Sequence, residues 1–398
     1  MAFRYYTQQF SNKIDNSTQS RRFEVPSWPF RADAVRSILI LRASQLTLSR
    51  RRKLLTFTAI SAIVCACIAF DEVDLDGTPI ASAKIDGSTV PLFYAKHYNF
   101  NAFGIEKLHP FDGNKYKRIH DYLITQKLRV ARDFIRPQEI TDKQLLTVHT
   151  PRYIASLQES KTLAHILEIP ILGRLPSFML DWRILRPMRL ASEGTSASCD
   201  AALKTRVAIN IGGGYHHAAS DQGGGFCVYS DAPIAIKALQ TAGKIRSALV
   251  VDTDAHQGNG FSEVACSLKN VYVLDFYDES VYPRPKVEES WSVPLRARTD
   301  GATYLKKLKE ILPQAIEKYR PDLIYYNAGS DVLATDPLAT LLLRPEDLIE
   351  RDYFVVQTAL KYKIPIAMAL AGGYGSQSAM AQARSIEKIL HTVDAIVQ

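Results

Sequence analysis

The chain has 398 residues, of which 46% are apolar and 23% charged, enough for one large domain with a sizeable core and an appendage. Its net charge of +8 arises in residues 1–53, where eleven basic residues face three acidic ones, and the remaining 38 basic and 38 acidic residues balance. The pI near 9.1 is therefore a property of this tail, and direct nucleic-acid binding by the rest of the chain is not expected. Five cysteines without Cys-x-x-Cys spacing argue against a disulfide framework and against a thiolate zinc site.

The N-terminal part of the chain divides into two predicted segments. Residues 1–53 form a basic tail rich in Arg and Ser, and residues 54–88 combine an apolar segment with an acidic linker. The uncharged stretch 54–70 has seventeen residues, at the lower limit of the roughly 17–25 that a membrane span needs. Three interpretations of it stay open: a membrane anchor, an organelle-targeting presequence, and a helix or disordered tail without a targeting signal. Residues 89–398 are predicted to form the globular domain.

From about residue 90 onward, β-rich apolar segments alternate with helical patterns, as in parallel βαβ units. The predicted strands are residues 91–95, 206–211, 248–251, 270–274, 323–326 and 364–370. The predicted helices include residues 232–242, 304–319 and 345–362. We therefore expect an α/β fold, with a single large domain built on a central, mainly parallel sheet flanked by helices.

Polar or glycine-rich residues follow the predicted strands. His216 and His217 come after one strand, Asp252 to His256 after another, and Asp331 after a third. In an open parallel sheet, ligands bind in the crevice at the carboxyl ends of the strands. The active site is therefore predicted at the C-terminal ends of the strands.

Asp254 and His256 are the first candidate metal ligands. Their i, i+2 spacing places a carboxylate and an imidazole on one side of an extended backbone. Asp331, after a different strand, is the predicted third ligand. Three oxygen and nitrogen ligands leave a coordination position for water, as in catalytic rather than structural zinc sites.

The adjacent residues His216 and His217 follow three glycines, a context that core packing explains poorly. Imidazole titrates near neutrality, so the pair suits the transfer of protons to and from a reacting water and a leaving amine. Each ring needs a partner on its other nitrogen, and Asp252 and Asn259 are the candidates.

Tyr374 follows two glycines and is predicted to donate its hydroxyl to a developing oxyanion. Residues 223–227 read Gly-Gly-Gly-Phe-Cys, consistent with a backbone that lines a narrow slot with Phe226 as an apolar wall.

These strings, in this order, resemble the zinc-dependent histone deacetylase family of the arginase/deacetylase fold, and most of all its class IV. The resemblance runs from about Tyr94 to near the C-terminus and leaves residues 1–88 outside. The matching strings are Gly104–Asp112, Val148–Tyr153, Gly213–His217, Gly223–Cys227, Asp252–Gly260, Asn327–Asp331 and Gly372–Tyr374.

The resemblance implies that residues 89–398 are a deacetylase catalytic domain with one catalytic Zn²⁺. Carried over by position, it makes Asp254, His256 and Asp331 the zinc ligands. His216 and His217 become the base and acid pair with Asp252 behind His216, and Tyr374 polarises the scissile carbonyl. Gly225 and Phe226 line the acyl-lysine tunnel, and a structural K⁺ is expected near Asp252 and Asp275.

Asn259 is a departure from many deacetylases, which have Asp behind the second histidine. An amide stabilises imidazolium less than a carboxylate does, so we expect His217 to hold a proton less readily. The resemblance to class IV makes this a feature of the class.

The predicted reaction is hydrolysis of N-ε-acetyl-lysine in a histone or another protein, with longer fatty-acyl-lysine as a further option. Two alternatives stay open. A binuclear ureohydrolase of the same fold wants a carboxylate two residues beyond the histidine, where this chain has Gly258. A catalytically silent binding module is disfavoured by the full set of ligands, histidines and tyrosine.

The expected partners are acylated protein substrates such as histone tails, and corepressor-type proteins. Family resemblance favours the nucleus or the cytoplasm. Organelle targeting or membrane tethering through residues 1–70 is the alternative, with membrane contact by residues 54–70.

Overall fold

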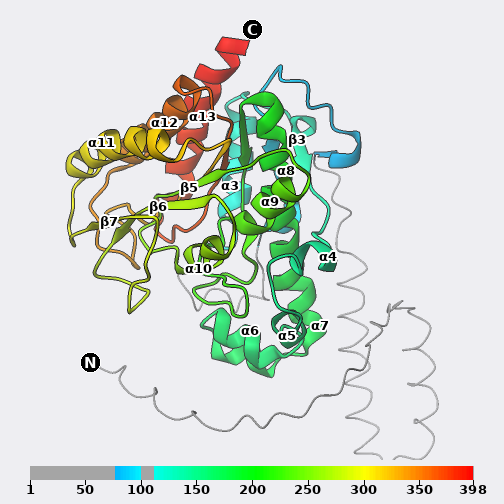
Figure 1. The fold of residues 1–398 in the computed structure, drawn as a ribbon. Coiled ribbons are helices and arrows are strands. Elements are labelled where there is room, and N and C mark those ends of the chain that lie inside the picture. Colours follow the sequence, from blue (N-terminus) through cyan, green and yellow to red (C-terminus); the bar gives the residue numbers. More distant parts are fainter. Residues whose placement is uncertain (1–76, 100–111, 398) are drawn as a thin grey trace, which may run out of the picture. The chain divides into compact units, whose positions relative to one another are not determined.

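The computed structural model describes residues 77–99 and 112–397 (Figure 1). The predicted tail 1–53 and the apolar stretch 54–70 lie outside these residues, as do residues 104–111 of the first family string. Within the two described ranges, no helix has the length and apolar character that a membrane crossing requires.

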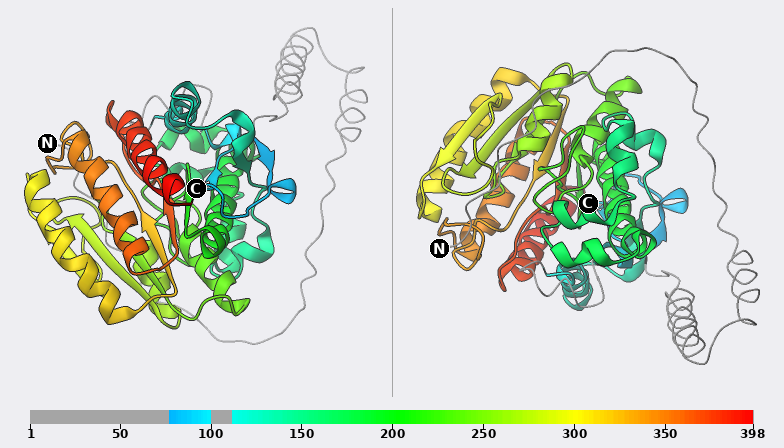
Figure 2. Two further views of the ribbon diagram at one scale, coloured as in Figure 1. Left: turned by 90° about the horizontal axis from the view of Figure 1, so that it is seen from above. Right: turned by 90° about the horizontal axis from the view of Figure 1, so that it is seen from below.

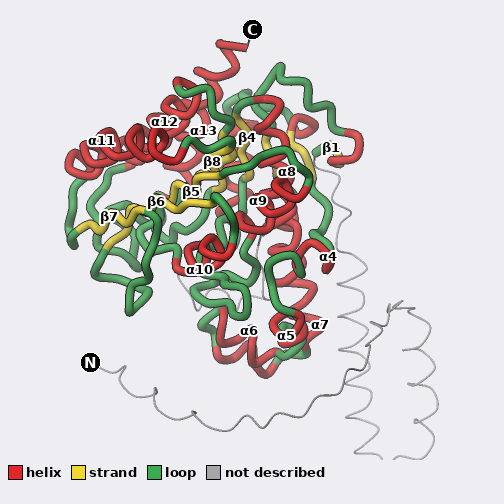
Figure 3. The backbone as a smooth tube through the Cα atoms, viewed as in Figure 1, coloured by secondary structure: helices red, strands yellow, loops and turns green. Residues whose placement is uncertain are grey.

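A sheet of nine parallel strands forms the centre of the described part of the chain (Figure 3). Its strand order is β1-β3-β2-β4-β9-β8-β5-β6-β7. The strands are β1 (Thr78–Pro79), β2 (Leu92–Phe93), β3 (Phe134–Arg136), β4 (Val207–Asn210), β5 (Ala248–Asp252), β6 (Val271–Asp278), β7 (Trp291–Leu295), β8 (Leu323–Asn327) and β9 (Ile366–Ala369). All pairs are parallel, so the predicted mainly parallel α/β sheet is confirmed.

Helices cover both faces of this sheet (Figures 1 and 2). The helices are α3 (Lys115–Thr125), α4 (Asp142–Leu145), α5 (Pro151–Ser156), α6 (Ser160–Ile166), α7 (Ser177–Leu180), α8 (Arg186–Thr205), α9 (Asp231–Thr241), α10 (Asn259–Ser267), α11 (Gly301–Tyr319), α12 (Pro345–Lys361) and α13 (Ser378–Val397). Helices α3, α11, α12 and α13 share one core with Leu249 and Val251 of β5, whereas α8, α9 and α10 pack with Ala248 and Val250. Alternate side chains of β5 thus pack into two different cores on opposite faces of the sheet, and the strand is buried throughout.

The strands that the sequence did not predict are β1, β3 and β7. The first two are only two and three residues long, too short to show a period. Strand β7 lies at the sheet edge and contains Pro294. Because proline has no amide to donate to a neighbouring strand, it argues against a central strand and masks this edge strand in the sequence. Because β1 pairs with β3, the sheet includes residues before position 89, where the globular domain was predicted to start. The other segment boundaries stay predictions.

A third core lies at the lower end of the domain in Figure 1, where the short helices α5, α6 and α7 gather. Its buried residues include Tyr153, Leu163 and Val228, and Tyr215 and Phe226 pack against it. This core therefore supports one wall of the crevice at the carboxyl ends of the strands.

Candidate active site

Asp254, His256 and Asp331 meet at the carboxyl ends of β5 and β8. One ligand atom from each lies within 4.8 Å of the others, and all three residues are buried. His256 Nδ1 is 2.8 Å from Asp331 Oδ2 and 3.3 Å from Asp254 Oδ1. Two ligand atoms that share one tetrahedral zinc at about 2.1 Å lie about 3.4 Å apart. The cluster therefore has the size and the donor set for one divalent ion.

Strand register explains why these side chains converge. Asp252 is paired with Asn327, so the loops that carry Asp254 and Asp331 leave adjacent strands at the same level. The Ala255 amide donates to Asp331 Oδ1 at 2.7 Å, which fixes that carboxylate. Gly329 must be glycine, because a Cβ there would collide with the Asp254 carboxylate.

The two carboxylates also interact electrostatically. Burial, with the nearby charge of Asp254, raises the pKa of Asp331 to about 7. Burial opposes protonation of His256, but its hydrogen bonds to the Asp254 and Asp331 carboxylates raise its pKa. A site with two buried acids on one imidazole is suited to a cation.

His216 lies beside this cluster and is oriented from behind. Its Nδ1 donates to Asp252 Oδ2 at 2.9 Å, and its Nε2 is 3.7 Å from Asp254 Oδ1. Burial favours the neutral ring, yet the charges of Asp252 and Asp254 raise the pKa of His216 to about 9.

His217 has the opposite electrostatic balance. Its ring centroid is 4.1 Å from that of His216, and its Nδ1 donates to Asn259 Oδ1 at 2.7 Å. Burial and the neighbouring charges of His216 and His256 lower the pKa of His217 well below its usual range. The ring therefore holds a proton poorly, in the direction that the sequence predicted, but the cause is burial and the neighbouring histidines, since the bond to Asn259 acts the other way. With Nδ1 donating to Asn259, Nε2 is left as an acceptor.

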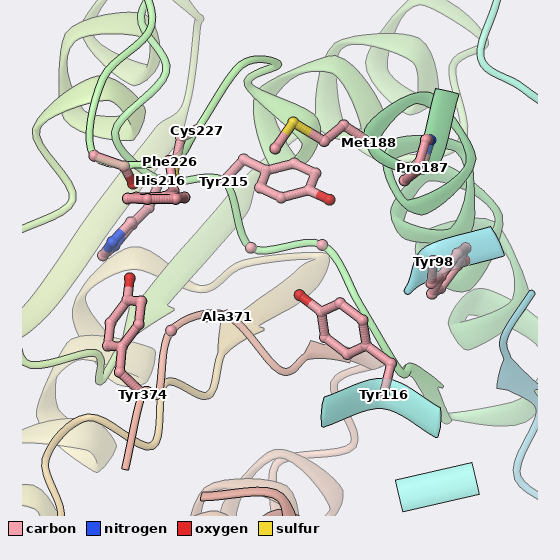
Figure 4. A pocket seen from close by; sticks show the side chains of 14 residues that line it. Tyr98, Tyr116, Pro187, Met188, Tyr215, His216, Phe226, Cys227, Ala371 and Tyr374 are labelled. Carbon is pink, nitrogen blue, oxygen red and sulfur yellow. Dashed lines mark hydrogen bonds between the residues drawn. The ribbon is translucent and has the colours of Figure 1, made fainter. Parts of the chain in front are cut away.

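Tyr374 faces His216 across the pocket (Figure 4). Burial and the Asp254 and Asp331 charges raise its phenol pKa, so the hydroxyl stays a donor. Its loop is held through the backbone on one side by Asp336, whose Oδ2 accepts from the amides of Tyr374 at 2.7 Å and Gly375 at 3.0 Å.

A buried lysine holds the other side of this tyrosine loop. Lys115 Nζ donates to the carbonyls of Ala371 and Gly372, both at 2.8 Å. The side chain is almost fully buried, and burial lowers its pKa to about 8. The loop is thus held between a buried cation and a buried anion.

Figure 4 shows the pocket that His216 and Tyr374 line. Gly225 and Phe226 lie on its wall, where the sequence predicted them. Gly225 has φ +50°, and a Cβ there would collide with the His217 ring, so both the conformation and the close approach require glycine. The far end of the pocket is lined by Tyr98, Tyr116, Met188 and Tyr215.

The sequence did not reveal several residues of this region. Tyr282 is 43% exposed, and its ring centroid lies 4.8 Å from that of His217 in a T-shaped contact, so it borders the site opposite Gly224. It sits in a proline-containing loop after β6, with no motif around it. Lys115 and Asp336 act through backbone groups and were also missed.

Asp252 and Asp275 are paired across β5 and β6, and Asp275 Oδ2 accepts from the Gly258 amide at 2.7 Å. The two acids near which K⁺ was predicted are therefore adjacent, and the cation itself stays a prediction.

Comparison with known proteins places this geometry in a family. A solved structure, "Crystal Structure of HDA15 HD domain", superposes with a TM-score of 0.64 at 20% identity, covering 77% of this chain and 90% of that one, a likeness of fold. Histone deacetylase 2 of Arabidopsis thaliana is 36% identical over 305 residues, which is 76% of this chain and 79% of that protein. The acetoin utilization protein AcuC of Bacillus subtilis is 26% identical over 269 residues, 61% of this chain and 67% of that protein.

The family model of the histone deacetylase domain matches residues 109–390, most of the described part of the chain. The match includes every predicted ligand, both histidines and the tyrosine. The chain therefore belongs to the histone deacetylase family and is a hydrolase that acts on amide bonds.

Proposed function

We propose that the chain is a zinc-dependent protein lysine deacylase that hydrolyses N-ε-acyl-lysine. The observation that carries this proposal is the position of the Asp254–His256–Asp331 cluster, whose Asp254 Oδ1 is 3.7 Å from His216 Nε2 at a pocket that also holds Tyr374. The three ligand atoms are close enough to share one ion, and carboxylate and imidazole are ligands that zinc accepts. A Zn²⁺ held there acts as a Lewis acid toward the scissile carbonyl and lowers the pKa of a water molecule.

The histidines divide the proton transfers between them. His217 is neutral, and its Nε2 takes a proton from the attacking water and returns it to the leaving lysine amine. His216, kept protonated by Asp252, stabilises negative charge as it develops. The Asn259 amide orients His217, and because burial and the charges of His216 and His256 outweigh the effect of this bond on the pKa, the proton is released readily.

Tyr374 stabilises the oxygen of the former carbonyl. Its hydroxyl remains protonated and donates a hydrogen bond that strengthens as the oxygen gains charge. Because Asp336 and Lys115 fix its loop, little reorganisation accompanies the reaction.

The pocket supports acetyl-lysine as substrate and longer acyl groups as a second candidate. Gly225 and Phe226 flank the lysine stem near His217. Beyond His216, the pocket continues to the largely apolar side chains of Met188, Tyr116 and Tyr98, which favours an acyl chain longer than acetyl.

The two rival functions are less well supported. A second metal ion would need a carboxylate ligand at position 258, where this chain has glycine. One metal-ligand cluster is found among residues 77–99 and 112–397. A silent binding module would not need the hydrogen-bonded histidine pairs or the anchored tyrosine.

The name of the Arabidopsis relative extends the proposal to histones as substrates. A nuclear or cytoplasmic location is proposed from membership of the family. Acylated histone tails or other acylated proteins are the proposed substrates, and corepressor-type proteins are the proposed assembly partners. We also propose that the chain belongs to class IV and that it holds a K⁺ near Asp252 and Asp275.

The test uses the purified full chain, stripped with a chelator and reloaded with Zn²⁺. Activity on acetyl-lysine and myristoyl-lysine peptides is expected to disappear on stripping and to return with about one Zn²⁺ per chain. No release from either peptide by the reloaded chain would overturn the proposal, and two tightly bound ions per chain would favour the binuclear alternative.

A further inference from the structure

Arg351 of α12 is a fully buried arginine outside the pocket. Its Nη1 donates to the carbonyl oxygen of Thr253 at 3.0 Å and to that of Gly329 at 2.7 Å. Thr253 directly precedes the predicted ligand Asp254, and Gly329 lies two residues before Asp331. One guanidinium nitrogen therefore joins the two loops that carry the carboxylate ligands.

The sheet itself does not hold these loops together. The register of β5 and β8 ends at Asp252 and Asn327, and beyond it Thr253 donates to the Asn327 carbonyl through its amide at 3.0 Å and its hydroxyl at 3.2 Å. The Ala255 amide also donates to the Asp331 side chain at 2.7 Å. Arg351 adds a link of another kind, because it joins backbone carbonyls of both loops through one side chain. Two buried carboxylates that face one ion repel each other when the ion is absent, so a link of this kind limits their separation.

The guanidinium is itself fixed in place. Its Nε donates to Asp352 Oδ1 at 2.8 Å, and Nη2 is 2.7 Å from the same oxygen. Asp352 also accepts from the hydroxyls of Tyr326 at 2.5 Å and Ser385 at 2.6 Å, which tie α12 to β8 and α13. The planar guanidinium thus contacts Asp352 through Nε and Nη2 and the loop carbonyls through Nη1. A lysine ammonium cannot make all of these contacts at once.

We propose that Arg351 is a positioning residue that sets the separation of Asp254 and Asp331 and thereby the affinity of the site for its divalent ion. The inference rests on the proposed metal site. Arg351 does not touch substrate or ion, and its effect passes through the carbonyls of Thr253 and Gly329. Substitutions at Arg351 should therefore change Zn²⁺ affinity first, and the rate at saturating Zn²⁺ less.

The test compares Arg351→Lys with Arg384→Met in the full chain. Arg384 is an exposed arginine on α13 whose guanidinium is 3.8 Å from Glu346. The dissociation constant for Zn²⁺ is measured by competition with a chelator of known affinity, and the thermal midpoint is measured without metal. Arg351→Lys is expected to weaken Zn²⁺ binding about 10- to 100-fold, as loss of outer partners of metal ligands does. Arg384→Met should stay within about twofold, as expected for a surface change away from the site.

A second variant separates positioning from stability. Arg351→Met alone leaves Asp352 buried without its cation and is expected to be unstable. Arg351→Met/Asp352→Asn removes both charges and keeps an acceptor for Tyr326, so it should fold. It should still bind Zn²⁺ about 10- to 100-fold more weakly than wild type.

The outcomes are distinguishable. Wild-type Zn²⁺ affinity in Arg351→Lys, or in the double variant, would overturn the role of Arg351 and leave the proposed function intact. If the wild-type chain binds no Zn²⁺, the proposed function falls and the inference falls with it.

Discussion

The metal-ligand cluster and the tyrosine loop lie against each other but are built differently. The predicted ligands are at most 8% exposed, and their loops leave adjacent strands in register. Tyr374 is half-buried and stands on a glycine-rich loop after β9 that distant residues hold by its backbone. An ion needs three side chains fixed relative to one another, which neighbouring strands supply. A hydroxyl donor needs only its own position fixed, which a cation and an anion from elsewhere in the chain supply.

Removing a ligand should have the largest effect on this pair of regions. Asp331→Asn takes away a charged ligand, and losing several kcal/mol of Lewis-acid stabilisation corresponds to at least about a 10³-fold fall in kcat/KM. Bound Zn²⁺ per chain should fall in parallel, as measured by elemental analysis. Asp322→Asn is the control, because Asp322 accepts from the Arg246 amide at the opposite ends of the strands. Full Zn²⁺ content in Asp331→Asn would show that Asp331 is not a ligand.

Tyr374→Phe should leave the metal region intact and remove only the hydroxyl donor. We expect kcat to fall about 10²- to 10³-fold, as for other oxyanion donors, with Zn²⁺ affinity unchanged. Steady-state kinetics at saturating Zn²⁺ measures the first quantity and chelator competition the second. Tyr362→Phe, which removes an exposed hydroxyl bonded to Glu317, should behave as wild type. Turnover that survives in Tyr374→Phe would assign the donor role to another residue.

Asp336→Asn tests whether the tyrosine loop depends on its anchor. Removing the charge weakens the bonds from the Tyr374 and Gly375 amides, and small displacements of catalytic groups cost up to about 10²-fold. We expect kcat to fall about 10- to 100-fold at unchanged Zn²⁺ affinity, the reverse of the pattern for Arg351→Lys. Asp300→Asn, at an exposed acid that caps α11 through the Thr303 amide, is the matched control. A loss of Zn²⁺ affinity in Asp336→Asn would mean that the two regions are not independent.

The same contrast explains what the sequence could predict. Asp254 and His256 are two residues apart at the end of a buried strand, and Asp331 follows another strand, so local patterns place all three at one edge of the sheet. Lys115 and Arg351 contact carbonyl oxygens 256 and 98 residues away. A carbonyl is present at every residue, so the partner position carries no sign of the contact. Asp336 binds amides and leaves no sign for the same reason.

The helices and longer strands were predictable because their burial is periodic. Strand β5 and helices α9, α11 and α12 lie within a few residues of the predicted bounds. Strand β6 runs on to Asp278, beyond the predicted end at residue 274, and Asp275 lies within it. The short edge strands depend on pairing with distant neighbours, which single-sequence patterns do not encode.

The smallest predicted effect concerns the charge on Lys115. Burial lowers the pKa of this ammonium to about 8, whereas lysine in an unfolded chain titrates near 10.4. Between these values the folded chain binds fewer protons at this position than the unfolded chain, so the contribution of Lys115 to the free energy of unfolding rises with pH. Relative to Lys115→Met, the wild type should gain about 1 kcal/mol between pH 8 and 9, measured by urea unfolding. Lys117→Met, on the exposed side of the same helix, should show no such drift. A flat difference would mean that Lys115 keeps its ordinary pKa, and a falling one that folding raises this pKa. Arg351 keeps its charge throughout this range. Alkaline pH should therefore weaken the Lys115 bonds to the tyrosine loop and leave the Arg351 bonds to the ligand loops unchanged.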